Sequence, residues 1–517
     1  MKNSKVSNHI TEYSITQVNE MISNASVYDV AEVSALNLAK SLSKRLENNI
    51  WLKREDQQSV FSFKLRGAYN KISHLDDTQK AAGIIAASAG NHAQGVALAA
   101  QRLKLDAKII MPVTTPTIKI DSVKSMGAEV ILSGDNYDEA CSYAYEIAEQ
   151  TKRVFIHPYD DIEVIAGQGT IGKEILEQFE GDVDAVFVPV GGGGLIAGVA
   201  TWIKQHSPKT KIIGVEPEDA STLYSAMKAG ERVILPQVGI FADGVAVKQI
   251  GKNTFELAKD HVDEVILVSI DEICAAIKDI FDDTRVVSEA AGALAVAGVK
   301  KYTQREKCKN LNLIAINSGA NINFDRLRHV TERTELGEGR EGLFAVTIPE
   351  QKGSFLKFCE LIGEHSISEF NYRHASDDEA HIFVGIKFRN AIDEKPKMIS
   401  MLSNHGYPIN DLSDNEMAKL HVRHMVGGHS RQLENELLYR FEFPEKPGAL
   451  LRFLSLMGAQ WNITLFHYRN HGAAYGRVLV GVQVPASEVD EFKQFLLDLG
   501  YSFYDETSNP IYRLFLK

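Results

Sequence analysis

Lys64 is the residue of this sequence that is best placed for covalent chemistry on a carbonyl compound. It follows Phe63 and begins a pattern of helical period, after a strand-like run at 49–55. A lysine near a helix N-terminus experiences the positive end of the helix dipole, which lowers the pKa of its amine. The neutral amine is a nucleophile toward aldehydes. Because a lone lysine is most often a solvated surface residue, the assignment depends on further residues with matching chemistry.

A run of four glycines is suited to binding a phosphate. The run and the residue after it are Gly191, Gly192, Gly193, Gly194 and Leu195. It lies between a strand-like segment, 185–190, and a helical segment, 196–202, so its backbone N–H groups gather at a helix N-terminus. Glycines also let the backbone close on an anion where side chains would obstruct it. A flexible linker is the alternative, but linkers rarely lie between a buried strand and a helix.

A second loop at a helix start is suited to binding a carboxylate. Its residues are Ser88, Ala89, Gly90, Asn91 and His92, and it continues to Gly95. It follows a strand-like segment, 83–87, and precedes a helical segment, 96–103. Asn91 adds a side-chain donor to the backbone N–H groups of the loop. His92 invites a role as a base, but a histidine in such a loop more often packs or orients it, so we assign it no catalytic role.

Ser318 lies at the C-terminal end of a third strand-like run, 314–317. Ligands of open α/β sheets bind outside the carboxyl ends of the strands, so Ser318 is a further candidate site residue.

Together these residues resemble the β-family, or fold type II, of pyridoxal-phosphate enzymes, and within it the biosynthetic threonine dehydratases. The likeness extends over roughly 29–517 and includes the segments 241–248, 288–293 and 323–328. Each motif is weak alone, whereas their order and spacing are specific. One departure is Ala290, where the family usually has a proline after Glu289. It leaves a local turn in question.

The resemblance implies a role for each candidate residue. Lys64 would hold pyridoxal 5'-phosphate and later take the Cα proton of the substrate as general base. The glycine run with Leu195 would bind the phosphate, Asn91 the ring's 3'-oxygen and Ser318 the pyridine nitrogen, with Phe63 also in the cofactor site. The loop of Ser88, Ala89, Gly90, Asn91 and His92 would bind the substrate carboxylate. No metal site is expected, and the acid that protonates the leaving hydroxyl is not identified, although the cofactor phosphate is a candidate.

Length and composition fit a protein of several domains. The chain has 517 residues and a net charge of −12, which argues against a nucleic-acid partner. Its four cysteines are widely spaced, and the polar N-terminus lacks the apolar core of a signal peptide, so we expect a cytoplasmic protein. The uncharged run 185–203 approaches the length of a membrane span, but the glycines divide it into a strand and a helix, and we expect no membrane contact.

Strand-like and helical segments alternate from 31 to about 330, which predicts an α/β catalytic domain with mainly parallel sheets at 1–330. The resemblance implies that it has two lobes. Residues 331–341 are charged and contain glycine, so we expect a surface connector there.

The remainder contains an internal duplication. Residues 349–358 recur at 444–453 with five identities in ten, an offset of 95 residues. Each copy follows the β-α-β-β-α-β order of ferredoxin-like modules, at 342–425 and 426–517. The copies resemble the paired ACT-like domains that bind amino acids, which implies α+β regulatory subdomains. Gly353, Gly448 and Asn462 are the candidate effector residues, and the second copy is the better candidate site. A dimerisation module without a ligand is the alternative.

The expected function is conversion of L-threonine to 2-oxobutanoate and ammonia, the first step of isoleucine biosynthesis. L-Serine remains an alternative substrate, since one methyl group separates the two. The resemblance implies isoleucine and valine as effectors, and the duplication suggests a homotetramer. Alternatives are a catabolic serine/threonine dehydratase, a serine racemase and, more remotely, a non-catalytic amino-acid sensor.

Overall fold

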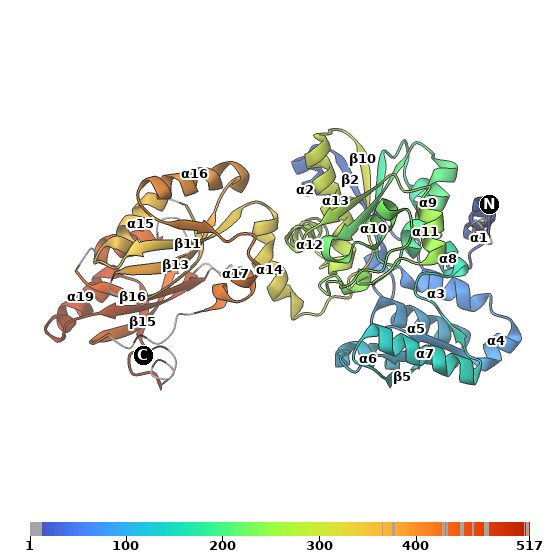
Figure 1. Ribbon diagram of the computed structural model, residues 1–517, viewed down its shortest axis with the longest axis horizontal. Helices are drawn as coiled ribbons and strands as arrows, with labels where there is room; N and C mark the ends of the chain where they lie inside the picture. The colour runs from blue at the N-terminus through green and yellow to red at the C-terminus, as the bar shows by residue number, and fades with distance from the viewer. Residues whose placement is uncertain are drawn as a thin grey trace, which may run out of the picture. The chain divides into compact units, whose positions relative to one another are not determined.

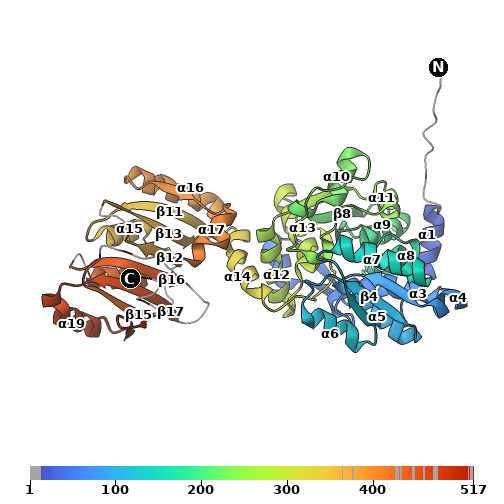
Figure 2. The ribbon, with the colours of Figure 1, turned by 60° about the horizontal axis from the view of Figure 1, so that its bottom comes forward.

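The computed structural model describes residues 13–363, 365–374, 378–425, 430, 433–444, 449–457, 460–469, 475–510, 512 and 516. The chain divides into two compact units, Met1–Thr334 and Glu335–Lys517 (Figures 1 and 2). The first unit is α/β, and the second unit carries an antiparallel sheet with helices. The predicted fold class is therefore confirmed for both parts of the chain.

The larger sheet of the first unit has the strand order β1-β2-β10-β7-β8-β9. Its strands are β1 (Leu36–Leu38), β2 (Asn49–Arg54), β10 (Asn312–Asn317), β7 (Ala185–Pro189), β8 (Lys211–Pro217) and β9 (Glu264–Val268). All neighbours pair in parallel except β1, which is antiparallel to β2. Ala185 and Phe187 face one core, whereas Val186 and Val188 face another. Burial on both faces explains why this strand is apolar throughout.

A smaller, fully parallel sheet has the order β5-β4-β3-β6. Its strands are β5 (Glu129–Leu132), β4 (Ala107–Met111), β3 (Ile84–Ala87) and β6 (Val154–Phe155). The first unit thus contains one mainly parallel and one fully parallel sheet, in agreement with the mainly parallel sheets predicted from the alternation of strands and helices.

The helices that cover these sheets begin with α1 (Ile15–Ser23), α2 (Lys40–Leu46), α3 (Lys64–Ser73), α4 (Asp77–Ala82), α5 (Asn91–Leu103), α6 (Thr117–Ser125) and α7 (Tyr137–Thr151). They continue with α8 (Ile162–Gln178), α9 (Gly194–His206), α10 (Thr222–Ala229), α11 (Lys252–Ala258), α12 (Ile270–Thr284), α13 (Ala290–Glu306) and α14 (Arg326–Gly337). Side chains of α12 and α13 pack on one face of the larger sheet, and side chains of α8 and α9 pack on the other. No helix among the described residues is long and apolar enough to span a membrane.

Two helices begin earlier than the sequence predicts. Helix α5 begins at Asn91 rather than at 96, and α9 begins at Gly194 rather than at 196. Gly95 therefore lies inside α5, where a Cβ atom would come within 3.0 Å of the Lys64 backbone. Glycine disfavours helix in isolation, but here it allows α3 and α5 to pack closely.

The sequence predicts a surface connector at 331–341, but most of this segment belongs to a helix in the structure. Helix α14 runs to Gly337, and β11 begins at Glu341. This segment is stabilised as a helix because Val330, Arg333 and Thr334 are buried. Arg333 also forms an ion pair with Asp271 at 3.1 Å.

The second unit is one eight-stranded sheet of order β14-β11-β13-β12-β16-β17-β15-β18. Its first copy contains β11 (Glu341–Pro349), α15 (Ser354–Ile362), β12 (Ile367–Arg373), β13 (Glu379–Lys387), α16 (Ala391–Asn404) and β14 (Ile409–Asp411), followed by α17 (Glu416–Leu420). Its second copy contains β15 (Glu436–Pro444), α18 (Ala449–Met457), β16 (Asn462–Arg469), β17 (Tyr475–Gln483), α19 (Val489–Leu499) and β18 (Ser502–Asp505). The predicted element order is thus observed in both copies.

The two copies join through antiparallel pairing of β12 with β16, and their apolar side chains form one core. The two copies also share an equivalent hydrogen bond from a strand backbone to a hydroxyl group. Leu343 N donates to Ser413 Oγ at 3.1 Å, and Leu438 N donates to Thr507 Oγ1 at 3.0 Å.

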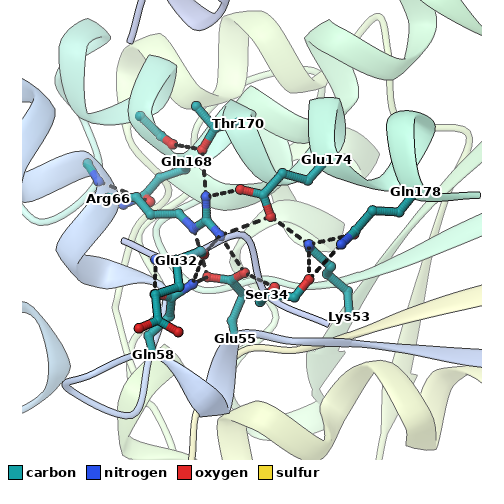
Figure 3. A network of polar contacts seen from close by, with 12 residues as sticks. Glu32, Ser34, Lys53, Glu55, Gln58, Arg66, Gln168, Thr170, Glu174 and Gln178 are labelled. Atoms are coloured by element: carbon teal, nitrogen blue, oxygen red, sulfur yellow. Dashed lines mark hydrogen bonds and ion pairs between the residues drawn. The ribbon is translucent and has the colours of Figure 1, made fainter. Parts of the chain in front are cut away.

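A network of buried charges fixes the first turn of α3. Arg66 is fully buried and donates to the carboxylates of Glu55, just after β2, and of Glu174 on α8 at 2.6–3.1 Å (Figure 3). Lys53 also contacts Glu174, at 2.5 Å. Burial opposes ionisation of Glu174, but Arg66 and Lys53 hold its pKa below the usual value. The charges of Arg66 and Lys53 thus balance those of Glu55 and Glu174. Arg66 lies two residues after Lys64 in the sequence.

We expect Arg66→Leu to lower the stability of the protein by about 3–5 kcal/mol, because it leaves buried carboxylates without their cation. The measurement is the urea unfolding midpoint followed by circular dichroism. Lys309→Ala serves as the control, since it breaks an exposed pair with Glu47 that is worth about 0–1 kcal/mol. Equal midpoints for the two variants would contradict a structural role for the network.

Candidate active site

Lys64 is the first residue of α3, and its side chain is partly buried. Its Nζ lies 3.3 Å from the carbonyl oxygen of Pro158 and 5.2 Å from the centre of the Phe63 ring. Burial lowers the pKa of Lys64 to about 8, while the carboxylate of Glu289 acts in the opposite direction. The direction of this pKa shift is the one expected from the sequence, and burial is its largest cause. A larger share of the amine is therefore neutral and nucleophilic near neutral pH.

The glycine run forms the turn between β7 and α9. Gly193 has φ +90°, a left-handed conformation that favours glycine, and no side chain caps the helix that follows. The carbonyl of Gly191 accepts from Thr222 Oγ1 at 2.8 Å, and that of Gly192 accepts from Thr254 Oγ1 at 2.7 Å. Across a trans peptide the next N–H points the opposite way, so the N–H groups of Gly192 and Gly193 face away from these threonines. They are arranged to bind an anion at the N-terminus of α9.

Tyr159 packs directly on the glycine run. A Cβ atom at Gly192 would lie 2.2 Å from the Tyr159 ring, so no other residue fits there. Because the preceding residue, Pro158, contacts the amine of Lys64, the 158–159 segment brings the lysine and the glycine run into one site.

The predicted carboxylate loop is divided between a turn and a helix. Ser88, Ala89 and Gly90 form the turn after β3, while Asn91 and His92 begin α5. Ser88 Oγ accepts from the N–H of Gly90 at 3.2 Å, and no side chain caps α5. The first N–H groups of α5 thus remain suited to a carboxylate.

His92 has a packing role in this structure. Its Nε2 lies 2.8 Å from the carbonyl oxygen of Ile156, and burial lowers its pKa to about 3. The imidazole ring is therefore neutral and enclosed, which agrees with assigning His92 no role in acid–base chemistry.

Ser318 follows β10 directly, as predicted, and is buried beside the lysine segment. Its carbonyl oxygen accepts from the N–H of Phe63 at 3.3 Å, and Ser62 forms an isolated bridge with Gly319. Within the part of the chain that the structure describes, the Ser318 hydroxyl has only a long contact, 3.4 Å, to the carbonyl oxygen of Ala291. It therefore keeps hydrogen-bonding capacity for a ligand atom.

Glu289 and Asn321 are site residues to which the sequence analysis assigned no role. Asn91 donates to Glu289 Oε1 at 2.6 Å and accepts from Asn321 Nδ2 at 2.7 Å. Both residues line a cavity together with Lys119, Asp243 and Arg326. Glu289 belongs to the segment 288–293, which is part of the family resemblance. That resemblance was the signal in the sequence that could have identified Glu289 as a site residue. Ala290, which stands where the family usually has a proline, does not disturb the turn. It is the first residue of α13, a position that accepts proline but does not require it.

The described residues contain no cluster of three or more His, Cys, Asp or Glu side chains that could hold a metal ion. A buried amine of low pKa, a glycine turn that leaves no room for a Cβ, two uncapped helix N-termini and a buried serine instead fit a phosphorylated aldehyde with a heterocyclic ring. Pyridoxal phosphate has these groups.

In the second unit, Gly353 and Asn462 line the same cavity, although they come from different copies. Gly353 has φ +83° and precedes α15, which has no side-chain cap. Glu350 accepts from Tyr372 at 2.6 Å and from Asn462 Nδ2 at 3.3 Å. Gly448 lies outside the described residues. Asn462, which was expected to serve a site in the second copy, lines this cavity beside the turn of the first copy. The corresponding turn of the second copy, 445–448, lies outside the described residues.

Comparison with known proteins gives matches over nearly the whole chain. A family described as pyridoxal-phosphate dependent enzyme matches residues 31–319. A family described as the C-terminal regulatory domain of threonine dehydratase matches 332–422 and 427–516. The chain is 53% identical to a biosynthetic L-threonine dehydratase of Burkholderia multivorans, over 96% of this chain and 98% of the relative. It is 54% identical to that of Escherichia coli, over 95% of each chain.

Solved structures resemble the catalytic part. Threonine deaminase isoform 2 from Solanum lycopersicum, in its processed form, superposes with a TM-score of 0.61 at 52% identity, covering 62% of this chain and 88% of that one. Maize serine racemase superposes with a TM-score of 0.57 at 31% identity, covering 62% and 96%. Since the relatives named threonine dehydratase match both units at more than half identity, the chain belongs to the biosynthetic threonine dehydratase family of pyridoxal-phosphate dependent enzymes.

Proposed function

We propose that this chain converts L-threonine to 2-oxobutanoate and ammonia with pyridoxal 5'-phosphate as cofactor, in the first step of isoleucine biosynthesis. The observation that carries the proposal is the meeting of the low-pKa Lys64 amine with the glycine turn and Ser318 in one site. The names of the relatives that match both units support threonine as the substrate. L-Serine is a second substrate, because the missing methyl group changes binding by only about 1–3 kcal/mol.

The positions of these residues support a cofactor site. Lys64 would bond covalently to the cofactor, and the N–H groups of the glycine run and of Leu195 would bind its phosphate. Asn91 would donate to the ring oxygen and Ser318 would bond the ring nitrogen, with Phe63 beside the lysine. When bound, pyridoxal phosphate supplies an aldehyde for covalent attachment and a ring that stabilises negative charge at the substrate Cα.

The chain's own groups then bind the substrate and move its protons. The first N–H groups of α5, with the turn Ser88, Ala89 and Gly90, bind the substrate carboxylate. The amine of Lys64, neutral above its pKa of about 8, takes the Cα proton as general base. Ser318 is uncharged and cannot hold a proton on the ring nitrogen as a carboxylate would, which favours loss of the β-hydroxyl group over transamination.

Serine racemase activity is the nearest alternative, since maize serine racemase shares the fold of the catalytic part. The second unit favours the biosynthetic dehydratase, because the regulatory family of threonine dehydratase matches nearly its whole length.

The cavity of the second unit supports an amino-acid effector. The Glu350 carboxylate suits an ammonium group, and the uncapped N-terminus of α15 suits a carboxylate. Leu454, Met457 and Trp461 line the same cavity and suit a branched aliphatic side chain. We propose that isoleucine binds here and inhibits, and that valine, one methylene shorter, competes and relieves the inhibition.

We further propose a homotetramer located in the cytoplasm. The duplicated regulatory unit supports an assembly in which subunits change state together.

Lys64→Ala should abolish the visible absorbance of the bound cofactor and reduce the rate of 2-oxobutanoate release by a thousandfold or more, on the order expected when nucleophile and base are lost together. Absorbance spectra and a 2-oxo acid assay measure the two effects. Lys44→Ala, at an exposed lysine of α2, should change neither. Turnover of Lys64→Ala at the parent rate would refute the assignment.

The cofactor-free protein should bind added pyridoxal phosphate faster as the pH rises, with a plateau above about 8. Only the neutral amine reacts, and burial lowers the pKa of Lys64 from 10.5 to about 8. Stopped-flow absorbance between pH 6 and 10 measures the rate. A rate that rises steadily up to pH 10 would instead indicate a solvated lysine.

Isoleucine should shift the dependence of the rate on L-threonine toward higher threonine and make it sigmoidal. Glu350→Gln should raise the isoleucine concentration for half-inhibition by roughly ten- to a hundredfold, since a hydrogen bond to a charged group contributes about 1.5–3 kcal/mol. Glu360→Gln, at an exposed position on α15, is the control. Unchanged inhibition in Glu350→Gln would exclude this cavity, whereas a parent enzyme indifferent to isoleucine would exclude feedback and leave the catalytic proposal intact.

A further inference from the structure

Glu289 occupies a capping position without acting as a cap. It is the N-cap residue of α13, yet its side chain makes no hydrogen bond to its own helix. The carboxylate instead accepts from Asn91 Nδ2 at 2.6 Å, a residue 198 positions earlier in the chain. Gly319 makes this possible, because a Cβ atom there would lie 2.6 Å from Glu289 Oε1. The buried carboxylate is therefore directed at Asn91 by the packing around it.

The opposite end of the Asn91 side chain is also fixed. Asn91 Oδ1 accepts from Asn321 Nδ2 at 2.7 Å, and the same Nδ2 donates to the carbonyl oxygen of Val60 at 2.9 Å. An ionised carboxylate can only accept, and Asn321 donates, so the two neighbours together determine which end of the Asn91 amide is which. One N–H of Asn91 bonds Glu289, and the other remains for a further acceptor.

We propose that Glu289 is a positioning residue: by accepting one N–H of Asn91, it orients the other N–H toward the ring oxygen of the cofactor. This inference rests on the proposed function, in which Asn91 binds that oxygen. Without Glu289, only the hydrogen bond from Asn321 would oppose a rotation of the Asn91 amide that turns its oxygen toward the ring oxygen of the cofactor, an arrangement that is repulsive.

The charges around Glu289 fit such a role. Burial, together with the charge of Asp243, raises the pKa of Glu289 to about 7, although Asn91, Lys119 and the N–H of Asn321 act in the opposite direction. Glu289 also raises the pKa of Lys64. A direct effect of Glu289 on Lys64 is therefore the competing explanation for any effect of its substitution, and the experiment must separate the two.

A double-mutant cycle on the cofactor-free protein makes this separation. Pyridoxal phosphate is titrated into the parent, Glu289→Gln, Asn91→Ala and the double variant, and the dissociation constant is measured by absorbance and protein fluorescence. Glutamine keeps the shape of the side chain but can donate as well as accept, so it no longer enforces the amide orientation. We expect Glu289→Gln to weaken binding about tenfold in the parent and less than twofold in the Asn91→Ala background.

Glu341→Gln is the matched control, because Glu341 is equally buried, 5% exposed, but lies in the second unit. It should leave the cofactor affinity unchanged, and thermal melting checks that every variant is folded. If Glu289→Gln weakens binding equally in both backgrounds, Glu289 acts independently of Asn91 and the inference is overturned, as it is if Glu289→Gln has no effect. If Asn91→Ala binds the cofactor as tightly as the parent, the assignment of Asn91 in the proposed function fails as well.

Discussion

The start of helix α3, which carries the proposed catalytic Lys64, depends on the guanidinium group of Arg66, two residues away. Helix α3 begins at Lys64 without a side-chain cap, so its first turn is held by other contacts. Arg66 provides them by bonding to Glu55 after β2 and to Glu174 on α8 (Figure 3). Such buried pairs contribute little to stability compared with well-packed apolar groups. Their value here is geometric, since the directional bonds fix the helix start from which the reactive amine extends.

The two units contain the same kind of glycine turn at the start of a helix. In each unit a glycine in the left-handed conformation, Gly193 or Gly353, precedes a helix whose N-terminus no side chain caps. Each turn therefore presents backbone N–H groups together with a partial positive charge. The first lies near a buried amine and suits a phosphate, whereas the second lies near Glu350 and suits an amino acid. The two turns thus differ in their neighbouring side chains rather than in their backbone.

Local patterns predicted much of the fold. Strand and helix periods located most of the elements, and the repeated 349–358 segment revealed the duplication, because these signals come from neighbours in the sequence. The helix starts at Asn91 and Gly194 were missed because Gly95 and the glycine run disfavour helix locally, while tertiary packing requires them. The partners of Asn91 were missed for another reason. Glu289 and Asn321 lie 198 and 230 residues away, and their meeting follows only from how β10 and α13 are placed.

The pairing of β12 with β16 has a consequence for how the duplicated unit can evolve. After a duplication two modules can normally diverge, and one can be lost. Here each copy covers the open edge of the other, and the cavity beside Gly353 takes Asn462 from the second copy. Deleting either copy would expose a long edge strand, which invites aggregation, and would also remove one wall of the cavity. The pair is thus inherited as a single module, and selection acts on both copies together.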